Sequence, residues 1–346
     1  MSDEIFTRNG IASMAYVGEK PWHQLGQELT PGASVDTWID EAGLNYDVLG
    51  QVVNFQDPQG NMMPFGTRKV LVRSDTLAPL EVVAKDYKIV QPKEIIEIFR
   101  GFVEAGNMSL ETAGVLKGGN KIWGLARIGK DLDAGDGDMV QNYLLLATSY
   151  DKSLSTTGQL TSVRVVCNNT LSFAINRGKS GKEQSIRIPH NQKFDSEKVK
   201  NKLGLIKETI DENAQIIQKL HKTTVSHDEA IAFFTHLLCT PKERKSGEVD
   251  IGSKARSMAK LWESYQHAPG REDSAWGLVN AVTYAVDHNT SARSDDTRLD
   301  SAWFGHGARQ KTEAYQLAQD TDFLDAIISK TAATNAVDRI LEKVAV

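Results

Sequence analysis

RKVLVRSDTLAPLEVVAKDYKIVQPKEIIEIFRGFVEAG, residues 68–106, carries the pattern that decides the fold. Its first half contains two runs rich in β-branched residues, separated by the turn-forming SDTLAP of residues 74–79, which predicts two strands of a hairpin. From Pro92 onward the apolar residues recur at spacings of three and four, so we expect an amphipathic helix that ends near Gly106. Two strands followed by a helix with one apolar face indicate a mixed α+β core.

Three more strand-like runs follow the helix: SLETAGVL (109–116), NKIWGLARIG (120–129) and MVQNYLLLATSY (139–150). The first two are joined by Lys117-Gly118-Gly119-Asn120, a combination that favours a hairpin turn. We therefore expect the strands between about Thr67 and Thr148 to form one antiparallel sheet, with the helix packed on one face.

The period changes to 3.6 residues after Phe194, and the remainder of the chain is predicted to be helical, with helices over 194–222, 226–238, 253–266, 275–288 and 321–344. The predicted organisation is an N-terminal segment (1–60), an α+β core of an antiparallel meander packed with a helix (61–193), and a helical C-terminal region (194–346). The N-terminal segment contains a short helix that Ser34 can cap and Gly43 can end.

The polar residues Trp276, Asn280, Thr283 and Asp287 form a stripe on the helix predicted for 275–288. Such a stripe either faces solvent or docks against another element.

One basic island interrupts an otherwise acidic chain of 346 residues and net charge −5. Residues 161–202 hold nine basic and three acidic residues, whereas residues 1–160 have a net charge of −7. Clustered cations can follow a nucleic-acid backbone by releasing its counterions, and lysines at a helix N-terminus are unfavourable without an anionic partner. The alternative is a solvated hairpin tip and an exposed helix face. The candidate phosphate contacts are Arg177, Lys179, Lys182, Arg187, Lys193 and Lys198.

The octet RVVCNNTL, residues 164–171, has two interpretations. In the first, its apolar residues belong to the core and its polar ones cap a helix that begins there. In the second, Arg164, Asn168 and Asn169 bind a phosphate or a base edge, because arginine offers a planar fork of donors and asparagine both donates and accepts. Tyr87, Trp123 and Tyr150 are candidates for stacking on bases, although aromatic residues in strands often belong to the core.

No complete catalytic or metal-binding motif is visible, and no cofactor is expected. Cys167 and Cys239 are too few for a disulfide scaffold, so we expect two free thiols. The sequence contains no apolar run long enough for a bilayer span and does not start like a signal peptide, so a cytoplasmic location is predicted.

Five segments together resemble the phage/plasmid-like family that is defined by a domain of unknown function. They are RVVCNNTL (164–171), PWHQLGQ (21–27), KDYKIVQP (85–92), ETAGVLKGGNKIWGLARIG (111–129) and AWGLVNAVTYAVDH (275–288). The resemblance implies a mobile-element origin, and hence a host cytoplasm if a phage encodes the protein, together with a shared fold. The strand meander beside a basic groove also resembles, at the level of the fold, the single-strand annealing recombinases that phages carry.

The function predicted from these patterns is non-covalent binding of single-stranded DNA. The prediction includes a homo-oligomer that could assist strand annealing in recombination. Two alternatives remain open at this point. One is an enzyme that acts on nucleic acid or a nucleotide through dispersed His, Asp and Asn residues, and the other is a protein-binding inhibitor of host defence.

Overall fold

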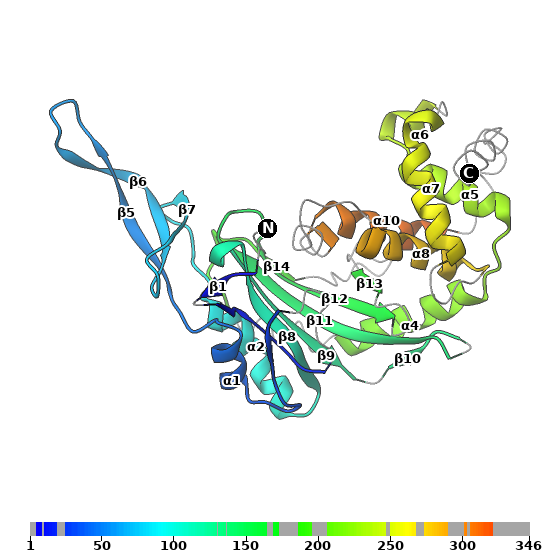
Figure 1. Cartoon of the computed structure of the whole chain (residues 1–346), viewed down its shortest axis with the longest axis horizontal. Coiled ribbons are helices and arrows are strands. Elements are labelled where there is room, and N and C mark those ends of the chain that lie inside the picture. The colour runs from blue at the N-terminus through cyan, green and yellow to red at the C-terminus, as the bar shows by residue number, and fades with distance from the viewer. Residues whose placement is uncertain are drawn as a thin grey trace.

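A computed structural model describes residues 5–8, 10–18, 25–129, 131–135, 137–164, 169–172, 186–195, 206–246, 250–267, 273–289, 301–302 and 305–320. A central sheet has helices α1 and α2 below it and helices α8 and α10 above it, while strands β5 and β6 project from one end as an arm (Figure 1). The helical C-terminal half lies at the opposite end. The predicted α+β class is therefore confirmed.

The central sheet has the strand order β13-β12-β11-β9-β8-β3-β4, and β10 and β14 pair with β11 and β12. All of these pairs are antiparallel except β3 with β4. The strands are β3 (Met14–Tyr16), β4 (Gln27–Glu28), β8 (Met108–Leu116), β9 (Lys121–Ile128), β10 (Leu132–Asp133), β11 (Met139–Ser149), β12 (Thr156–Arg164), β13 (Asn169–Ser172) and β14 (Ile186–Ile188). A two-stranded ribbon of β1 (Thr7–Arg8) and β2 (Ile11–Ala12) precedes them. The predicted turn between β8 and β9 is present as a short 3-10 turn, η1 (Lys117–Gly119), in which Gly118 has a φ of 67°.

A second sheet of three strands holds β5 (Val48–Gln56), β6 (Met62–Arg73) and β7 (Pro79–Ala84). The predicted hairpin of β6 and β7 is confirmed, but the expectation of one sheet from Thr67 to Thr148 is wrong. Strand β6 begins earlier than predicted and pairs with β5, which lies in the segment assigned to the N-terminal region. Hydrophobic patterning identifies strands but not their partners, and here the partner precedes the pattern in the chain.

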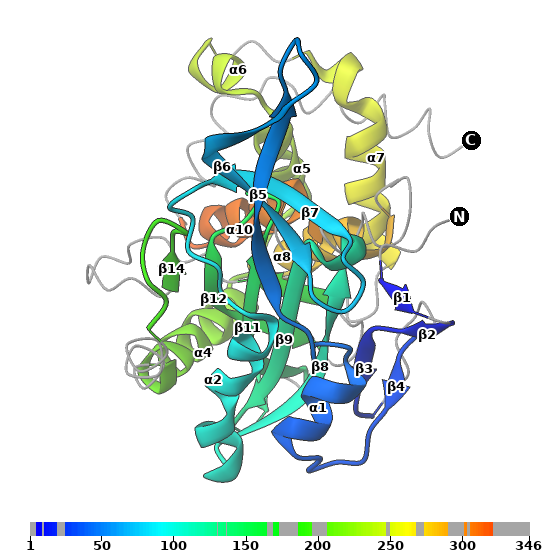
Figure 2. The ribbon, with the colours of Figure 1, turned by 90° about the vertical axis from the view of Figure 1, so that its left-hand side faces the viewer.

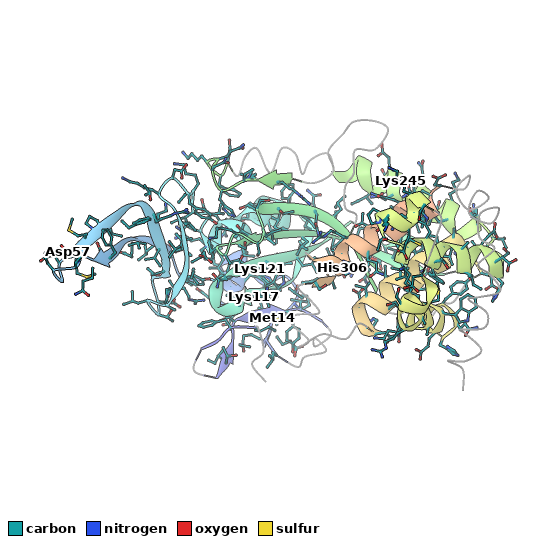
Figure 3. All side chains as sticks on the ribbon, turned by 90° about the horizontal axis from the view of Figure 1, so that it is seen from above. Met14, Asp57, Lys117, Lys121, Lys245 and His306 are labelled. Atoms are coloured by element: carbon teal, nitrogen blue, oxygen red, sulfur yellow. The ribbon has the colours of Figure 1, made fainter. Side chains whose placement is uncertain are left out.

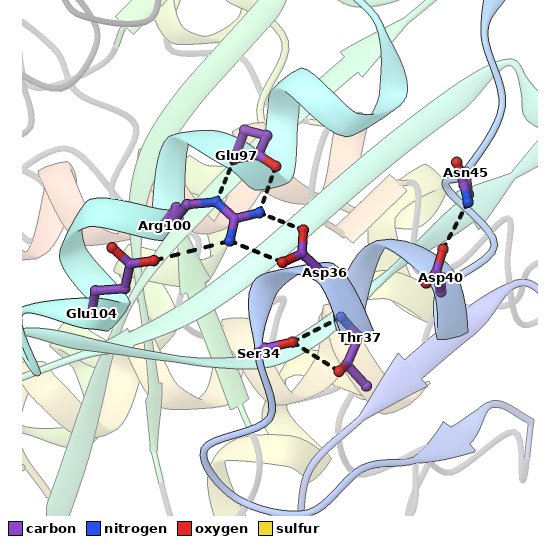
Figure 4. Close-up of polar contacts among 8 residues, drawn as sticks. All are labelled: Ser34, Asp36, Thr37, Asp40, Asn45, Glu97, Arg100 and Glu104. Atoms are coloured by element: carbon purple, nitrogen blue, oxygen red, sulfur yellow. Dashed lines mark hydrogen bonds and ion pairs between the residues drawn. The ribbon is translucent and has the colours of Figure 1, made fainter.

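Helices α1 (Val35–Glu41) and α2 (Pro92–Glu104) pack together beneath the sheet. Both begin as the sequence predicts. Ser34 Oγ accepts from the Thr37 backbone N–H at 3.1 Å, and Pro92 is the first residue of α2, directly after Gln91, whose backbone N–H donates to the Glu94 carboxylate at 2.6 Å. On the surface, the Arg100 guanidinium joins α2 to Asp36 of α1 at 2.7 Å (Figure 4).

The C-terminal helices include four that the sequence predicts and two that it does not. The predicted ones are α4 (Ile206–Lys222), α5 (His227–Leu238), α7 (Ile251–His267) and α8 (Ala275–Tyr284), which continues into a π-helical turn, η2 (Ala285–Asn289). The additional helices are α6 (Pro241–Ser246) and α10 (His306–Ala318). The helix predicted for residues 321–344 lies outside the described residues. None of the helices that the structure describes is long and apolar enough to cross a membrane.

The polar stripe of α8 is buried rather than solvent-exposed. Trp276, Asn280 and Thr283 are each at most 5% exposed, and Asp287 forms an ion pair at 2.8 Å with Lys311 of α10, which is fully buried. A charged side chain can be buried in this way only beside a group of opposite charge, because either charge alone would lose its hydration without compensation. The stripe therefore docks α8 against its neighbours, which is the second of the two interpretations.

One hydrophobic core connects the sheet to the C-terminal helices. It contains Ile96 of α2, Leu144 of β11, Ile217 of α4, Phe233 of α5 and Val282 of α8. A smaller core that includes Met14, Trp123 and Leu145 forms separately. The helical region is thus packed on the α+β core.

Candidate nucleic-acid interface

Several predicted contact residues lie outside the described residues: Asn168, Arg177, Lys179, Lys182 and Lys198. The same is true of Cys167, whereas Cys239 is a free, buried thiol, as expected for that residue. The remaining predicted contacts, Arg164, Asn169, Arg187 and Lys193, lie within the described parts of the chain.

Part of the octet forms a strand rather than the start of a helix. Asn169–Ser172 is β13, and Asn169 lies opposite Arg164 of β12 in an antiparallel pair. The helix-cap interpretation of the octet is therefore wrong. The pairing brings the backbones of Arg164 and Asn169 together at the edge of the sheet, where β13 packs against α8 and α10.

Two of the three predicted stacking residues are in the interior. Trp123 is 1% exposed and belongs to the smaller core, and Tyr150 is fully buried, with its hydroxyl donating to the Val90 carbonyl at 2.7 Å. Both faces of the sheet are covered here. Ile122 and Trp123 are neighbours on opposite faces of β9 and are both buried, as are Ser149 at the end of β11 and Tyr150 after it. Neither ring is accessible to a base in this structure.

Tyr87 is in a different environment from the other two aromatic residues. Its ring is only partly buried and stacks on the His190 ring, with the ring centroids 4.6 Å apart and an interplanar angle of 18°. Its hydroxyl donates to the Ser149 carbonyl at 3.0 Å, and burial raises the pKa of Tyr87 above its usual value. The phenol thus stays neutral and anchored, and the ring is the part of the side chain that could contact a ligand.

Backbone pairing brings two predicted cations to this aromatic stack. Strand β14 pairs with β12 so that Arg187 lies opposite Thr157, and Figure 2 shows β14 beside β12 at the edge of the sheet. Three residues after Arg187, the His190 carbonyl accepts from the Lys88 backbone N–H at 2.6 Å. Lys193 follows shortly after. The segment that carries Arg187 and Lys193 is therefore fixed beside the segment that carries Tyr87.

The structure adds cations that the sequence interpretation did not select. Lys85 and Lys88 flank Tyr87 and are both exposed, as are Arg187 and Lys193. Lys69 of β6 also reaches this place, where its Nζ donates to the Tyr87 carbonyl at 2.7 Å, and burial followed by repulsion from Lys88 lowers the pKa of Lys69. The sequence KDYK places lysines on both sides of Tyr87. This combination of basic and aromatic residues could have identified the site from the sequence.

We call Lys85, Lys88, Arg187 and Lys193, together with the Tyr87–His190 ring pair, the basic patch. Among the residues that the structure describes, none of the four cations forms an ion pair. Among the described carboxylates, Asp86 and Asp195 lie beside these cations in the sequence, and the charge of Asp151 acts on Tyr87, so the four cations outnumber the three carboxylates. Exposed cations without partners around an aromatic ring can bind phosphates and stack a base.

A second polar cluster lies on strands β8, β9 and β11. Tyr143 donates to a Glu111 carboxylate oxygen at 2.9 Å, while Arg127 forms ion pairs with Asp131 and, at 3.8 Å, with Glu111. Burial raises the pKa of Glu111, and the Tyr143 hydrogen bond opposes that effect. These groups satisfy one another, so the cluster stabilises the sheet. In the described residues, no group of three or more His, Cys, Asp or Glu side chains is arranged to hold a metal ion.

Comparison with known proteins supports the family and gives no activity. The family model described as "Domain of unknown function (DUF932)" matches residues 79–303, which include four of the five segments noted in the sequence. No curated protein and no solved structure matches the chain. The matched region covers more than half of the chain and contains Tyr87, both partners of the β12–β13 pair and all four cations of the basic patch. The protein therefore belongs to the DUF932 family.

Proposed function

We propose that the protein binds single-stranded nucleic acid at the basic patch. The observation that supports this proposal is the gathering of four exposed cations, unpaired among the described residues, around a partly buried aromatic stack. Cations that already have carboxylate partners would gain little from a phosphate, whereas these can replace the counterions of a nucleic-acid backbone.

The mechanism is non-covalent. The four cations neutralise phosphates, and a base stacks on the accessible side of the Tyr87–His190 pair. Further candidate contacts are Arg164 and Asn169, whose backbones pair at the β12–β13 edge, and Arg177, Lys179 and Lys182 in the sequence between β13 and β14. This proposal also includes a phage or plasmid origin, a host-cytoplasmic location, a homo-oligomeric state and a role in annealing during recombination.

The test is a charge reversal of the patch: Lys85→Glu, Lys88→Glu, Arg187→Glu and Lys193→Glu in one variant. Binding of a fluorescent single-stranded oligonucleotide is measured by anisotropy over a salt series. If four phosphate contacts are lost, the slope of log affinity against log salt should become shallower by about 3, since each single-strand contact contributes about 0.7. Affinity at low salt should fall strongly.

A matched control reverses four exposed cations of the helical region: Lys242→Glu, Lys245→Glu, Arg256→Glu and Arg309→Glu. This variant changes the net charge by the same amount but leaves the patch intact, so its salt slope should remain close to that of the wild type. The proposal fails if the wild-type protein binds no oligonucleotide at low salt, or if the control loses as much affinity as the patch variant.

A further inference from the structure

The outer part of the β5–β6 hairpin exposes large apolar side chains. We call residues 52–66 the outer arm. Phe55 lies directly opposite Met63, and Phe65 follows two residues later on the same strand, so the three side chains share one face of the ribbon. They are 50%, 44% and 46% exposed, and Val52 and Met62 are 64% and 65% exposed. Such an apolar surface is unusual on a protein that acts alone.

The outer arm is almost uncharged. Asp57, at its tip, is the only charged residue between 52 and 66, and its carboxylate accepts hydrogen bonds from the Gln59 and Asn61 backbones at 2.9 and 2.8 Å. These hydrogen bonds close the turn, and hydrogen bonding by Asn61 holds the pKa of Asp57 below its usual value. A nucleic-acid backbone requires cations, and the outer arm has none to offer. The chemistry of the outer arm instead fits an uncharged, apolar partner surface.

A second copy of the same arm has that chemistry. An apolar face without net charge is self-complementary, which is the requirement for a contact around a two-fold axis. The arm also projects well away from the body: Asp57 and Lys245 lie at opposite ends of the molecule (Figure 3), so two arms can meet without contact between the bodies.

The exposed area fits a weak contact. Met62 is next to Met63 in the strand and therefore lies on the opposite face. With about 200 Å² for a large apolar side chain, Phe55, Met63 and Phe65 together expose about 280 Å² per copy, so two copies would bury about 560 Å². That area fits an association that forms at high protein concentration. An isolated two-stranded ribbon is only marginally stable in water, so the contact would also stabilise the arm itself.

We propose that the outer arm is a dimerisation surface, on which the apolar face of Phe55, Met63 and Phe65 packs against the same face of a second copy. The inference gives the proposed homo-oligomer a contact surface but does not depend on nucleic-acid binding. It is tested on the full chain in the absence of nucleic acid, so the two proposals can fail separately.

The first experiment measures the mass of the protein by sedimentation velocity over a wide range of concentrations. The variant Phe55→Ser, Met63→Ser, Phe65→Ser should raise the dissociation constant of the dimer by about tenfold or more, because it removes the central apolar contacts. The control Ile11→Ser, Leu77→Ser, Val82→Ser removes three exposed apolar side chains, 61%, 72% and 40% exposed, that lie outside the outer arm. It should associate like the wild type.

A second experiment guards against a variant that merely damages the arm. Met63→Lys and Met63→Glu should each prevent association, because like charges would meet across the two-fold axis, and an equimolar mixture of the two should restore it. Wild-type protein that remains monomeric at all concentrations would overturn the proposal. So would a serine variant or charged variants that associate normally, a mixture that does not recover, or a serine variant that loses oligonucleotide binding while its mass stays unchanged, which would assign the arm to nucleic acid.

Discussion

At the scale of single residues, Arg73 joins the arm sheet to the body. Its side chain is 1% exposed, its Nε and Nη2 donate to the two carboxylate oxygens of Asp75 at 3.0 and 2.8 Å, and its guanidinium lies over the rings of Phe6 and Tyr46. Gly119 makes room for it, because a Cβ at that position would lie 2.8 Å from Arg73 Nη1. A buried cation between two rings and a carboxylate fixes the base of β6 in one position.

Replacement of Arg73 should therefore be costly. Arg73→Met would remove both hydrogen bonds from Arg73 to the largely buried Asp75 carboxylate, and we expect the free energy of unfolding to fall by about 3 kcal/mol or more. Arg100→Met is the control: Arg100 contacts the carboxylates of Asp36, Glu97 and Glu104 but is 29% exposed, so the loss should be below about 1 kcal/mol. Urea unfolding followed by circular dichroism measures both. Equal losses would contradict the role given to Arg73.

At the scale of elements, the pairing of β8 with β9 depends on a close contact between a glycine and a tryptophan. Gly114 lies directly opposite Trp123, and a Cβ on Gly114 would be 2.4 Å from the Trp123 ring and 2.9 Å from the carbonyl oxygen of Ser13, the residue just before β3. Trp123 can cover the sheet here only because its neighbour has no side chain. The same contact explains why Trp123 belongs to the core.

Gly114→Ala should destabilise the protein by about 1 to 3 kcal/mol, since neither a buried indole nor a backbone carbonyl can move away cheaply. Gly101→Ala is the matched control. Gly101 lies in the interior of α2 with no atom within 4 Å of an added Cβ, so alanine there should stabilise the protein by about 0.5 to 1 kcal/mol through its higher helix propensity. Thermal unfolding of both variants tests the opposite signs. A stabilised Gly114→Ala protein would refute the packing argument.

At the scale of the whole molecule, the sheet and the C-terminal helices share one core. Trp276 of α8 adds a polar link, because its indole N–H donates to the buried Asp138 carboxylate, just before β11, at 3.0 Å. Elements that share buried surface lose it together when either unfolds. Packing contacts therefore cross the boundary that the sequence predicts near residue 194 between the α+β core and the helical region.

We expect a single cooperative unfolding transition, with the same midpoint by far-ultraviolet circular dichroism and by tryptophan fluorescence. Trp276→Phe should lower the free energy of unfolding by about 2 kcal/mol, since it removes a donor to a buried carboxylate, and should keep the transition single. Two separated transitions, with residues 194–346 unfolding independently, would contradict the shared core.

The sequence by itself determined the local features of this protein. Caps, turns and helical periods depend on residues close together in the chain, which is why the cap at Ser34, Pro92 at the start of α2 and the turn at Gly118 were predictable. Helix α10 escaped prediction because its buried face includes Lys311 and Thr312, so its apolar pattern is weak.

The tertiary structure alone decided which segments meet. The pairing of β5 with β6, the burial of Trp123 and Tyr150, and the approach of Lys88 to His190 join residues that no local pattern connects. The basic patch is an example: its cations come from two segments about a hundred positions apart, and their proximity follows from the pairing of β14 with β12 and the backbone contact at His190. Strand pairing and core packing are non-local, so residue identity along the chain could indicate the chemistry of the site but not its assembly.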